Sequence, residues 1–288
     1  MANISVVINT LNEAKNLPRA IASVKGLASE IVVIDMESDD KTVEIAKELG
    51  AKVFSHKRTG YVEPARNFAI SKATGEWILI LDADEEVTQG LSLHIKKILK
   101  NPTADYYAVP RKNIIFGKWM KYSRWWPDYN IRFFRKGFVS WSDEIHSVPL
   151  TQGIGADIQA KEELAILHNN YNSVTSYVER MLRYSKVQSA ELMKNGYVFK
   201  WTDLIEKPLN EFFGRFFAGE GYKDGIHGLG LSFLQAFSEL TLYLQIWEKQ
   251  GFIDEDVTKK DFSKVLEKGI KDSKWWLRKK FTIFGRFF

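Results

Sequence analysis

The feature that most constrains the fold is an alternation of short apolar runs with helical segments over residues 4–90. Four runs are rich in β-branched and aliphatic residues and lack a helical period: "ISVVINT" (4–10), "EIVVIDM" (30–36), "KVFSH" (52–56) and "EWILILD" (76–82). Such runs are typical of buried strands. Strands that alternate with helices predict βαβ units with right-handed crossovers and a mostly parallel sheet.

The segments between these runs have helical patterns. The first places Leu17, Ile21 and Val24 at helical spacing, and the second, "ESDDKTVEIAKELGA", offers Ser, Asp and Asp as capping residues and Gly50 as a stop. The third, "EPARNFAISKATG" (63–75), has a proline near its start and a glycine after its end. We therefore expect an α/β fold with helices flanking the sheet.

Carboxylates follow the strands at the edge where α/β proteins bind ligands. Asp35 and Asp82 stand at the carboxyl ends of two predicted strands. Asp82 and Asp84 alternate around the small Ala83, so both can face one Mg²⁺ or Mn²⁺ ion, with Glu86 as a further ligand. The alternative is a helix beginning within "DEEVTQGL", since acidic residues favour a helix N-terminus.

Composition and charge limit the class of function. The chain has no cysteine, which excludes disulfides and thiolate metal sites and suits a reducing compartment. Residues 271–288 carry six basic residues and one acidic residue, which accounts for the whole formal net charge of +5. Nucleic-acid binding needs a broad basic face, so a nucleic-acid partner is disfavoured. The N-terminus has no basic leader and predicts no signal peptide.

The second half of the chain has a different texture. Residues 105–149 are rich in aromatic residues and arginine and predict strands joined by loops, and residues 173–195 and 230–250 predict long helices. We expect one domain over residues 1–170, with halves 1–104 and 105–170, and a helical extension over 171–288. Residues 229–247 and 271–288 suit an anionic membrane surface; a terminal helix docked on the domain is the alternative for the tail.

The blocks "VVINTLNEAKNL", "IVVIDMESDDKT" and "ARNFAISKATGEWILILDADEE" closely resemble the nucleotide-sugar-binding half of family 2 glycosyltransferases, which have the Rossmann-like GT-A fold. The resemblance implies a UDP-sugar donor, with Asp35 at the base edge, Ser38 near the ribose and Arg66 at the pocket floor. It implies that Asp82 and Asp84 bind the metal. The whole donor-binding set would be Thr10, Asn12, Glu13, Asp35, Ser38, Arg66, Asp82, Ala83 and Asp84. Taken singly, Asn12, Asp35 and Ser38 also fit a turn and a helix cap.

The second half resembles, more loosely, lipopolysaccharide core β-1,4-glucosyltransferases, through "RWWPDYNIRFFRKG", "EIHSVP" and "DGIHGLGLSFLQAF". That group is inverting, metal-dependent and works at the cytoplasmic membrane face. Inversion requires a base, for which Glu144 is preferred over Asp143. The family tends to have Val-His-Glu where this chain has Ile145, His146 and Ser147, so both assignments stay open. His146 and His168 are candidates for the metal shell or for phosphate contact; structural roles are the alternative.

Aromatic and basic residues of the second half are candidates for acceptor or phosphate binding. They are Trp125, Trp126, Arg132, Arg135 and Trp141. Sugar rings stack on tryptophan, which is also ordinary core material. Arg132 and Arg135 are three positions apart, so a regular strand would send at most one of them into the site.

The expected function is an inverting transfer of a hexose, glucose in the first place, to a hydroxyl of a glycan, glycolipid or lipid-linked acceptor of the cell envelope. The expected location is the inner face of the cell membrane, and an oligomer is possible. A polyprenyl-phosphate sugar transferase is the alternative within the fold, and a catalytically silent membrane scaffold is the alternative from another class.

Overall fold

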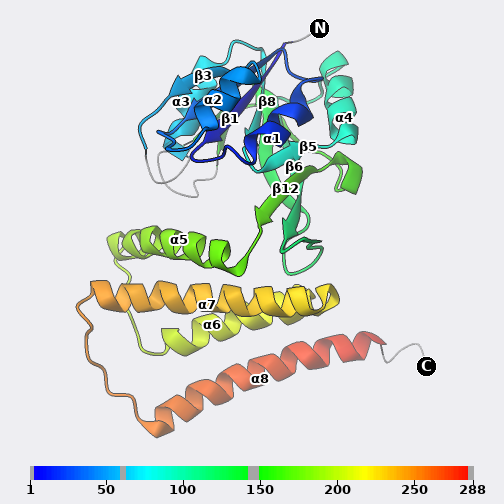
Figure 1. Ribbon diagram of the computed structural model, residues 1–288. Coiled ribbons are helices and arrows are strands. Elements are labelled where there is room, and N and C mark those ends of the chain that lie inside the picture. Colours follow the sequence, from blue (N-terminus) through cyan, green and yellow to red (C-terminus); the bar gives the residue numbers. More distant parts are fainter. Residues whose placement is uncertain (1–2, 59–62, 142–148, 285–288) are drawn as a thin grey trace. The chain divides into compact units, whose positions relative to one another are not determined.

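The computed structural model describes residues 3–58, 63–141 and 149–284, and the chain divides into two units (Figure 1). The first consists of the residues up to Ile114 together with Pro127–Asn170. The second consists of Ile115–Trp126 and the residues from Tyr171 onward. A short segment of the aromatic-rich region thus belongs with the helices.

Four parallel strands form the first part of the sheet of the first unit, in the order β3-β2-β1-β4. Their bounds are Ile4–Thr10 for β1, Glu30–Asp35 for β2, Lys52–Ser55 for β3 and Trp77–Asp82 for β4. The register pairs Thr10 with Asp35 and Asn9 with Asp82. The carboxyl ends of β1, β2 and β4 therefore lie nearly level, and the residues that follow these strands share one edge of the sheet.

Helices cover both faces of these strands. Helix α1 (Leu17–Val24) buries Leu17, Ile21 and Val24 on one face, as the spacing predicts, and α2 (Thr42–Glu48) packs its Ala46 into the same core. Helix α3 (Glu63–Lys72) packs Ala69 and Ile70 on the other face. Gly50, after α2, has φ +85°, a conformation that only glycine adopts without cost.

The rest of the sheet is mixed, which corrects the expectation of a mostly parallel one. Strand β8 (Asp128–Arg135) pairs antiparallel with β4, and β6 (Tyr106–Ile115) pairs antiparallel with β8. Strand β12 (Ile166–Tyr171) pairs antiparallel with β5 (Glu85–Val87). The remaining short strands are β7 (Lys118–Trp119), β9 (Val139–Ser140), β10 (Leu150–Thr151) and β11 (Gly155–Asp157).

The acidic run after β4 forms a strand where the alternative prediction placed the start of a helix. In β5, Glu85 and Val87 are buried and Glu86 between them is not, which is the alternation of a strand. Helix α4 (Gln89–Lys100) begins later, and the Thr88 side chain caps it by accepting a hydrogen bond from the Leu91 N–H. The carboxylates therefore do not stabilise a helix N-terminus.

The second unit is helical. Its α-helices are α5 (Val174–Lys194), α6 (Asp203–Phe213), α7 (Ile226–Lys249) and α8 (Lys259–Phe284). Helices α5 and α7 share a core that includes Tyr177, Met181 and Leu231, and Tyr177 also contacts Ser238 of α7 through its hydroxyl, 3.1 Å away. Among the helices that the structure describes, none combines the length and apolar character that crossing a membrane requires.

Candidate active site

The loops that follow β1 and β2 are tied together by the polar residues that the sequence selects. The backbone N–H of Asn12 donates to Oγ of Ser38 at 2.8 Å, and the Asn12 side chain accepts from the Asp39 N–H at 2.7 Å. Asn12 has φ 58°, which asparagine tolerates better than most residues. The buried Asp35 accepts from the Ser38 N–H at 3.0 Å and from the Thr10 hydroxyl at 3.4 Å.

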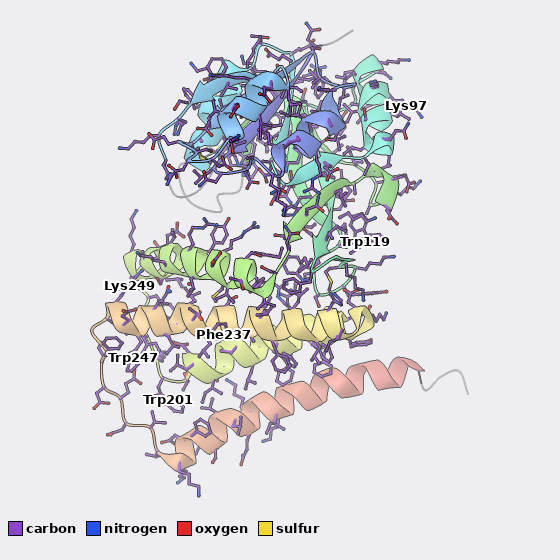
Figure 2. All side chains as sticks on the ribbon, in the orientation of Figure 1. Lys97, Trp119, Trp201, Phe237, Trp247 and Lys249 are labelled. Atoms are coloured by element: carbon purple, nitrogen blue, oxygen red, sulfur yellow. The ribbon has the colours of Figure 1, made fainter. Side chains whose placement is uncertain are left out.

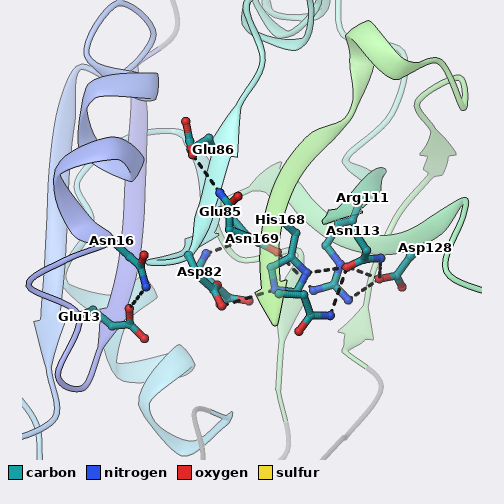
Figure 3. Close-up of polar contacts among 12 residues, drawn as sticks. Glu13, Asn16, Asp82, Glu85, Glu86, Arg111, Asn113, Asp128, His168 and Asn169 are labelled. Carbon is teal, nitrogen blue, oxygen red and sulfur yellow. Dashed lines mark hydrogen bonds and ion pairs between the residues drawn. The ribbon is translucent and has the colours of Figure 1, made fainter. Parts of the chain in front are cut away.

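Glu13 extends this arrangement toward α1. Its N–H donates to Oγ1 of Thr42 at 2.8 Å, and its carboxylate accepts from Nδ2 of Asn16 at 2.8 Å (Figure 3). The predicted donor-binding residues of both loops thus bond to one another across the loops. Neither Asp35 nor Ser38 caps α2, whose N-cap residue is Lys41. A carboxylate has about four acceptor positions, so Asp35 can still accept from a ligand.

At the end of β4, Asp82 is surrounded by positive charge. Its Oδ2 accepts from Nη2 of Arg132 at 2.6 Å, and its Oδ1 lies 3.4 Å from Nη2 of Arg66. Burial alone would raise the pKa of Asp82, but the two guanidinium groups outweigh burial and hold that pKa far below its ordinary value. Asp82 therefore stays ionised with arginine as its counter-ion.

Glu85 is the second acid beside Arg132. Its side chain is fully buried; Oε1 accepts from Arg132 at 2.7 Å and from Arg111 at 3.3 Å, and Oε2 accepts from the Asp82 N–H at 2.9 Å. Burial alone would lower the pKa of Arg132, yet Asp82 and Glu85 raise it above its ordinary value. A buried charge needs such partners, and here each charge has at least one.

Arg135 lies elsewhere on β8. Its guanidinium is 3.8 Å from Oδ1 of Asp105 and stacks over the ring of Trp77, 5.3 Å from the centroid. Arg132, by contrast, is buried beside Asp82. Of the two arginines, one contacts the acidic residues at the end of β4.

Asp84 faces a histidine from strand β12, the partner of β5. Nε2 of His168 lies 3.6 Å from Oδ2 of Asp84, and Nδ1 of the same ring lies 2.7 Å from Oδ1 of Asn113. The backbone carbonyl of Asp84 accepts from the Asn169 N–H at 3.0 Å, which fixes this residue against β12. Ala83, between the two aspartates, is buried.

Glu86 points away from this pair (Figure 3). Its carboxylate accepts from Nδ2 of Asn169 at 3.0 Å and lies 3.7 Å from a guanidinium nitrogen of Arg19. Across residues 3–58, 63–141 and 149–284, no group of three or more acidic or histidine side chains is arranged to hold a metal ion.

Arg66 and its neighbour Asn67, both on α3, hold the segment around Trp141. Asn67 donates to the Trp141 carbonyl at 2.6 Å and accepts from the Trp141 N–H at 2.9 Å. The Arg66 guanidinium stacks over the Trp141 ring at 5.5 Å and reaches Asp82 on its other side. Residue 141 is buried, and it lies close to the acidic end of β4.

Paired polar loops, an arginine-bound acid and an Asp–His pair therefore gather at the sheet edge where α/β proteins bind ligands. A sequence model described as glycosyl transferase family 2 matches residues 5–151. The chain belongs to glycosyl transferase family 2. An uncharacterized glycosyltransferase of Rickettsia typhi is 33% identical over 247 residues, covering 83% of this chain and 84% of the relative. One of Rickettsia felis is 32% identical over 83% of this chain and 87% of the relative.

Solved structures are similar to this chain at low sequence identity. Residues 1–349 of S. aureus TarS, in complex with UDP, match with a TM-score of 0.47 and 15% identity, covering 89% of this chain and 94% of that one. A mannosyltransferase of Pyrobaculum calidifontis in complex with GDP-Man and Mn²⁺ matches with a TM-score of 0.47 and 14% identity, covering 96% and 83%.

Family 2 membership fixes the class of protein as a glycosyltransferase and the fold as mixed α/β of the GT-A type, with a curled sheet and flanking helices. The alternative of a silent scaffold is therefore set aside. The finer resemblance to lipopolysaccharide core enzymes stays a prediction.

Five residues that the sequence selects lie outside the described part of the first unit. Asp143, Glu144 and His146 lie outside the described residues. Trp125 and Trp126 belong to the second unit, where Trp125 lies 5.4 Å from the Arg215 guanidinium and Trp126 meets Trp119 edge to face. Their proposed contacts with an acceptor stay predictions.

Sequence reasoning missed the residues that support the Asp–His pair. They are Glu85, Arg111, Asn113 and Asp128. Arg111 and Asn113 are two positions apart on β6 and so share a face, and the register places Arg111 opposite Asp128 of β8. The two-residue spacing of Arg111 and Asn113 was visible in the sequence. The pairing of β6 with β8, which brings both residues to Asp128, was not.

Proposed function

We propose that this family 2 glycosyltransferase moves a hexose, glucose in the first place, from a UDP-sugar to a hydroxyl group with inversion at the anomeric carbon. The observation that carries the proposal is the Asp84–His168 pair at the ligand-binding edge of the sheet, 3.6 Å apart. At the same edge lie the loops that follow β1 and β2. There the Asp35 carboxylate retains lone pairs that can accept a hydrogen bond from the N–H of a nucleotide base. A nucleotide that contacted those loops would present its diphosphate toward the pair.

The residues fit a divalent cation bound in part by the protein. Asp84 supplies a carboxylate and His168 an imidazole nitrogen, both ordinary ligands of Mn²⁺, and Mg²⁺ is commonly held by one or two carboxylates plus substrate phosphates. Asp82 is less suited, because Arg132 and Arg66 already neutralise it. Of the expected ligands, we therefore assign Asp84, together with His168, to the cation. When bound, the ion would offset the negative charge on the departing diphosphate.

The chemistry requires a base on the side of the sugar opposite the diphosphate. Glu144 or Asp143 would take the proton of the acceptor hydroxyl, whose oxygen forms the new bond to the anomeric carbon as the bond to the diphosphate oxygen breaks. This assignment rests on the family resemblance. Trp141, held by Asn67, is two residues before Asp143.

For the acceptor we propose a glycan or glycolipid of the cell envelope, as in lipopolysaccharide core synthesis, met at the cytoplasmic membrane surface. Helix α7 supports a surface role: Ile226, Phe233, Phe237 and Leu244 are exposed and recur at helical spacing on one side. A polyprenyl-phosphate acceptor would suit the same features, and the product distinguishes the two: a phosphate-linked sugar is released by mild acid, whereas a glycan-linked sugar is not.

Calorimetric titration with UDP tests the donor site. Wild-type protein should bind UDP more tightly with Mn²⁺ than without it, and Asp84→Asn should lose at least tenfold of the metal-dependent gain. The control is Glu86→Gln, whose carboxylate is engaged by Asn169. Equal binding with and without Mn²⁺ would reject the metal site, and tighter binding of GDP or dTDP would reject UDP as the donor nucleotide.

A further inference from the structure

The imidazole of His168 has a different partner at each ring nitrogen (Figure 3). Nδ1 lies 2.7 Å from Oδ1 of Asn113, and Nε2 lies 3.6 Å from Oδ2 of Asp84. His168 and Asn113 are both buried, so water competes little for the first contact. In a neutral imidazole, the hydrogen bond at one nitrogen decides which nitrogen carries the proton.

A carboxylate fixes the orientation of the Asn113 amide. Nδ2 of Asn113 lies 3.0 Å from Oδ2 of Asp128, and an ionised carboxylate only accepts hydrogen bonds. The NH₂ end must therefore face Asp128, which turns Oδ1 toward His168. Asn170 donates to the same Oδ1 at 3.4 Å, in agreement with this orientation. Because Oδ1 only accepts, the shared proton belongs to Nδ1 of His168.

Asp128 is itself held in place by Arg111. Nε and Nη2 of Arg111 donate to Oδ2 of Asp128 at 3.0 and 2.6 Å. The β6–β8 register sets the two residues opposite each other, and Arg111 is further fixed by Glu85, 3.3 Å away. A guanidinium stays charged in proteins, so it keeps an acceptor in front of Asn113.

With the proton on Nδ1, the lone pair of Nε2 faces a carboxylate oxygen of Asp84. Two acceptors in that position repel each other unless a second proton on Nε2 or a metal ion lies between them. We infer that Asn113 is a positioning residue that selects the Nδ1–H form of His168 and keeps Nε2 available to a divalent cation shared with Asp84. The cation part rests on the proposed function; the tautomer follows from the contacts of Asn113 and Asp128.

The tautomer can be read without metal. Proton–nitrogen correlation spectra of the histidine rings are recorded well above the ordinary imidazole pKa of about 6.5, and the His168 signals are assigned by their loss in His168→Gln. We expect the Nδ1–H form in wild type, loss of that preference in Asn113→Ala, and retention in Asn170→Ala, which removes the other donor to Oδ1. A proton on Nε2 in wild type, or an unchanged tautomer in Asn113→Ala, would overturn the inference.

Mn²⁺ affinity, followed by electron paramagnetic resonance in the presence of UDP, gives the second measurement. Asn113→Ala should weaken Mn²⁺ binding roughly tenfold or more, whereas Asn170→Ala should change it by less than about threefold. If Asn113→Ala folds poorly, Asp128→Asn replaces it; its amide can accept or donate, so Asn113 is free to turn and the tautomer should become mixed. An Nδ1–H wild type that binds no Mn²⁺ would reject the cation and the metal-dependent function, whereas an Nε2–H wild type that binds Mn²⁺ would reject the role of Asn113 alone.

Discussion

At the residue scale, the acids after β4 differ more in their surroundings than in their chemistry. Glu85 is fully buried between Arg132 and Arg111, and its neighbour Glu86 has a side chain that is 28% exposed. The same functional group is thus a buried counter-ion at one position and a half-buried group with a long ion pair at the next.

Glu85→Gln should lower the free energy of unfolding by about 3 kcal/mol, because it leaves the buried Arg132 and the partly buried Arg111 with one fewer negative partner. Glu86→Gln, one residue away, should change it by less than about 1 kcal/mol, since a solvated ion pair contributes little. Urea denaturation of both variants checks the comparison. Equal losses would mean that the burial of Glu85 does not control its contribution.

The acidic residues after β4 also show which site residues a sequence can predict. Asp82 and Asp84 were predictable because they follow an apolar run at a strand end. Glu85 was not, because its importance comes from Arg111 and Arg132, which lie 26 and 47 positions away and meet it only through the pairing of β4, β8 and β6. Asn113 was hidden for the same reason, since its partners His168 and Asp128 come from two other strands.

At the element scale, Glu30 ties the starts of neighbouring strands together. Its carboxylate accepts from Ser5 of β1, from Lys52 of β3 at 2.7 Å and from the Thr74 hydroxyl at 2.8 Å. Burial raises the pKa of this carboxyl, but its hydrogen bonds to Lys52, Ser5 and Thr74 outweigh burial and lower the pKa to about 2.

Because the folded pKa of Glu30 lies below the unfolded pKa of about 4.3, protonation favours the unfolded chain. The contribution of Glu30 to the free energy of unfolding should be complete above about pH 4.3 and should fade as the pH falls toward 2. The stability gap between wild type and Glu30→Gln, measured by urea denaturation across that range, should narrow. Glu48→Gln, at an exposed position of α2, is the control and should stay within about 0.5 kcal/mol of wild type.

Helix α7 carries two glycines with opposite requirements. A Cβ added at Gly228 would lie 1.8 Å from the carbonyl oxygen of Gly221, whereas one at Gly230 would meet nothing within 4 Å. Gly228→Ala should therefore lower the free energy of unfolding by about 1–3 kcal/mol. Gly230→Ala should raise it by about 0.5–1 kcal/mol, because alanine favours a helix interior. Hydrogen exchange of the α7 amides measures both effects; a stabilised Gly228→Ala would contradict the close approach.

Element prediction succeeded where one pattern dominated. The runs 4–10, 30–36 and 76–82 became β1, β2 and β4 with ends shifted by at most one residue. The segment "DEEV" left a strand and a helix start both open, because three or four residues contain too few repeats to separate a strand period from a helical one. Pairing with β12 decides its conformation, and that pairing joins residues about eighty positions apart. The antiparallel pairs β4–β8 and β6–β8 likewise join segments that are distant in the sequence, so the sequence did not predict a mixed sheet.

At the scale of the whole molecule, apolar exposure and positive charge concentrate in the second unit. On α7 the exposed fractions are 59% for Phe233 and 47% for Phe237 (Figure 2 labels Phe237). Phe233 also packs at a tilt against Phe212 of α6, with ring centroids 4.6 Å apart, so the patch is aromatic and spans two helices. Residues 271–288 hold the net positive charge of the chain. In sequence terms, an aromatic helix face together with a basic tail is the combination that the membrane-surface proposal requires.

The double variant Phe233→Ser/Phe237→Ser should bind vesicles containing anionic lipid roughly tenfold or more weakly, since each buried phenylalanine contributes on the order of 1.5–3 kcal/mol. Its UDP affinity should be unchanged, because both residues lie outside the first unit. Deleting residues 271–288 should remove the dependence on anionic lipid, and added salt should weaken wild-type binding. Leu93→Ser, at a 54% exposed position of α4, is the matched control for loss of apolar surface. Vesicle sedimentation decides between the alternatives: if the double variant and the deletion both bind like wild type, the tail and α7 serve internal packing and the acceptor must be reached without a membrane surface.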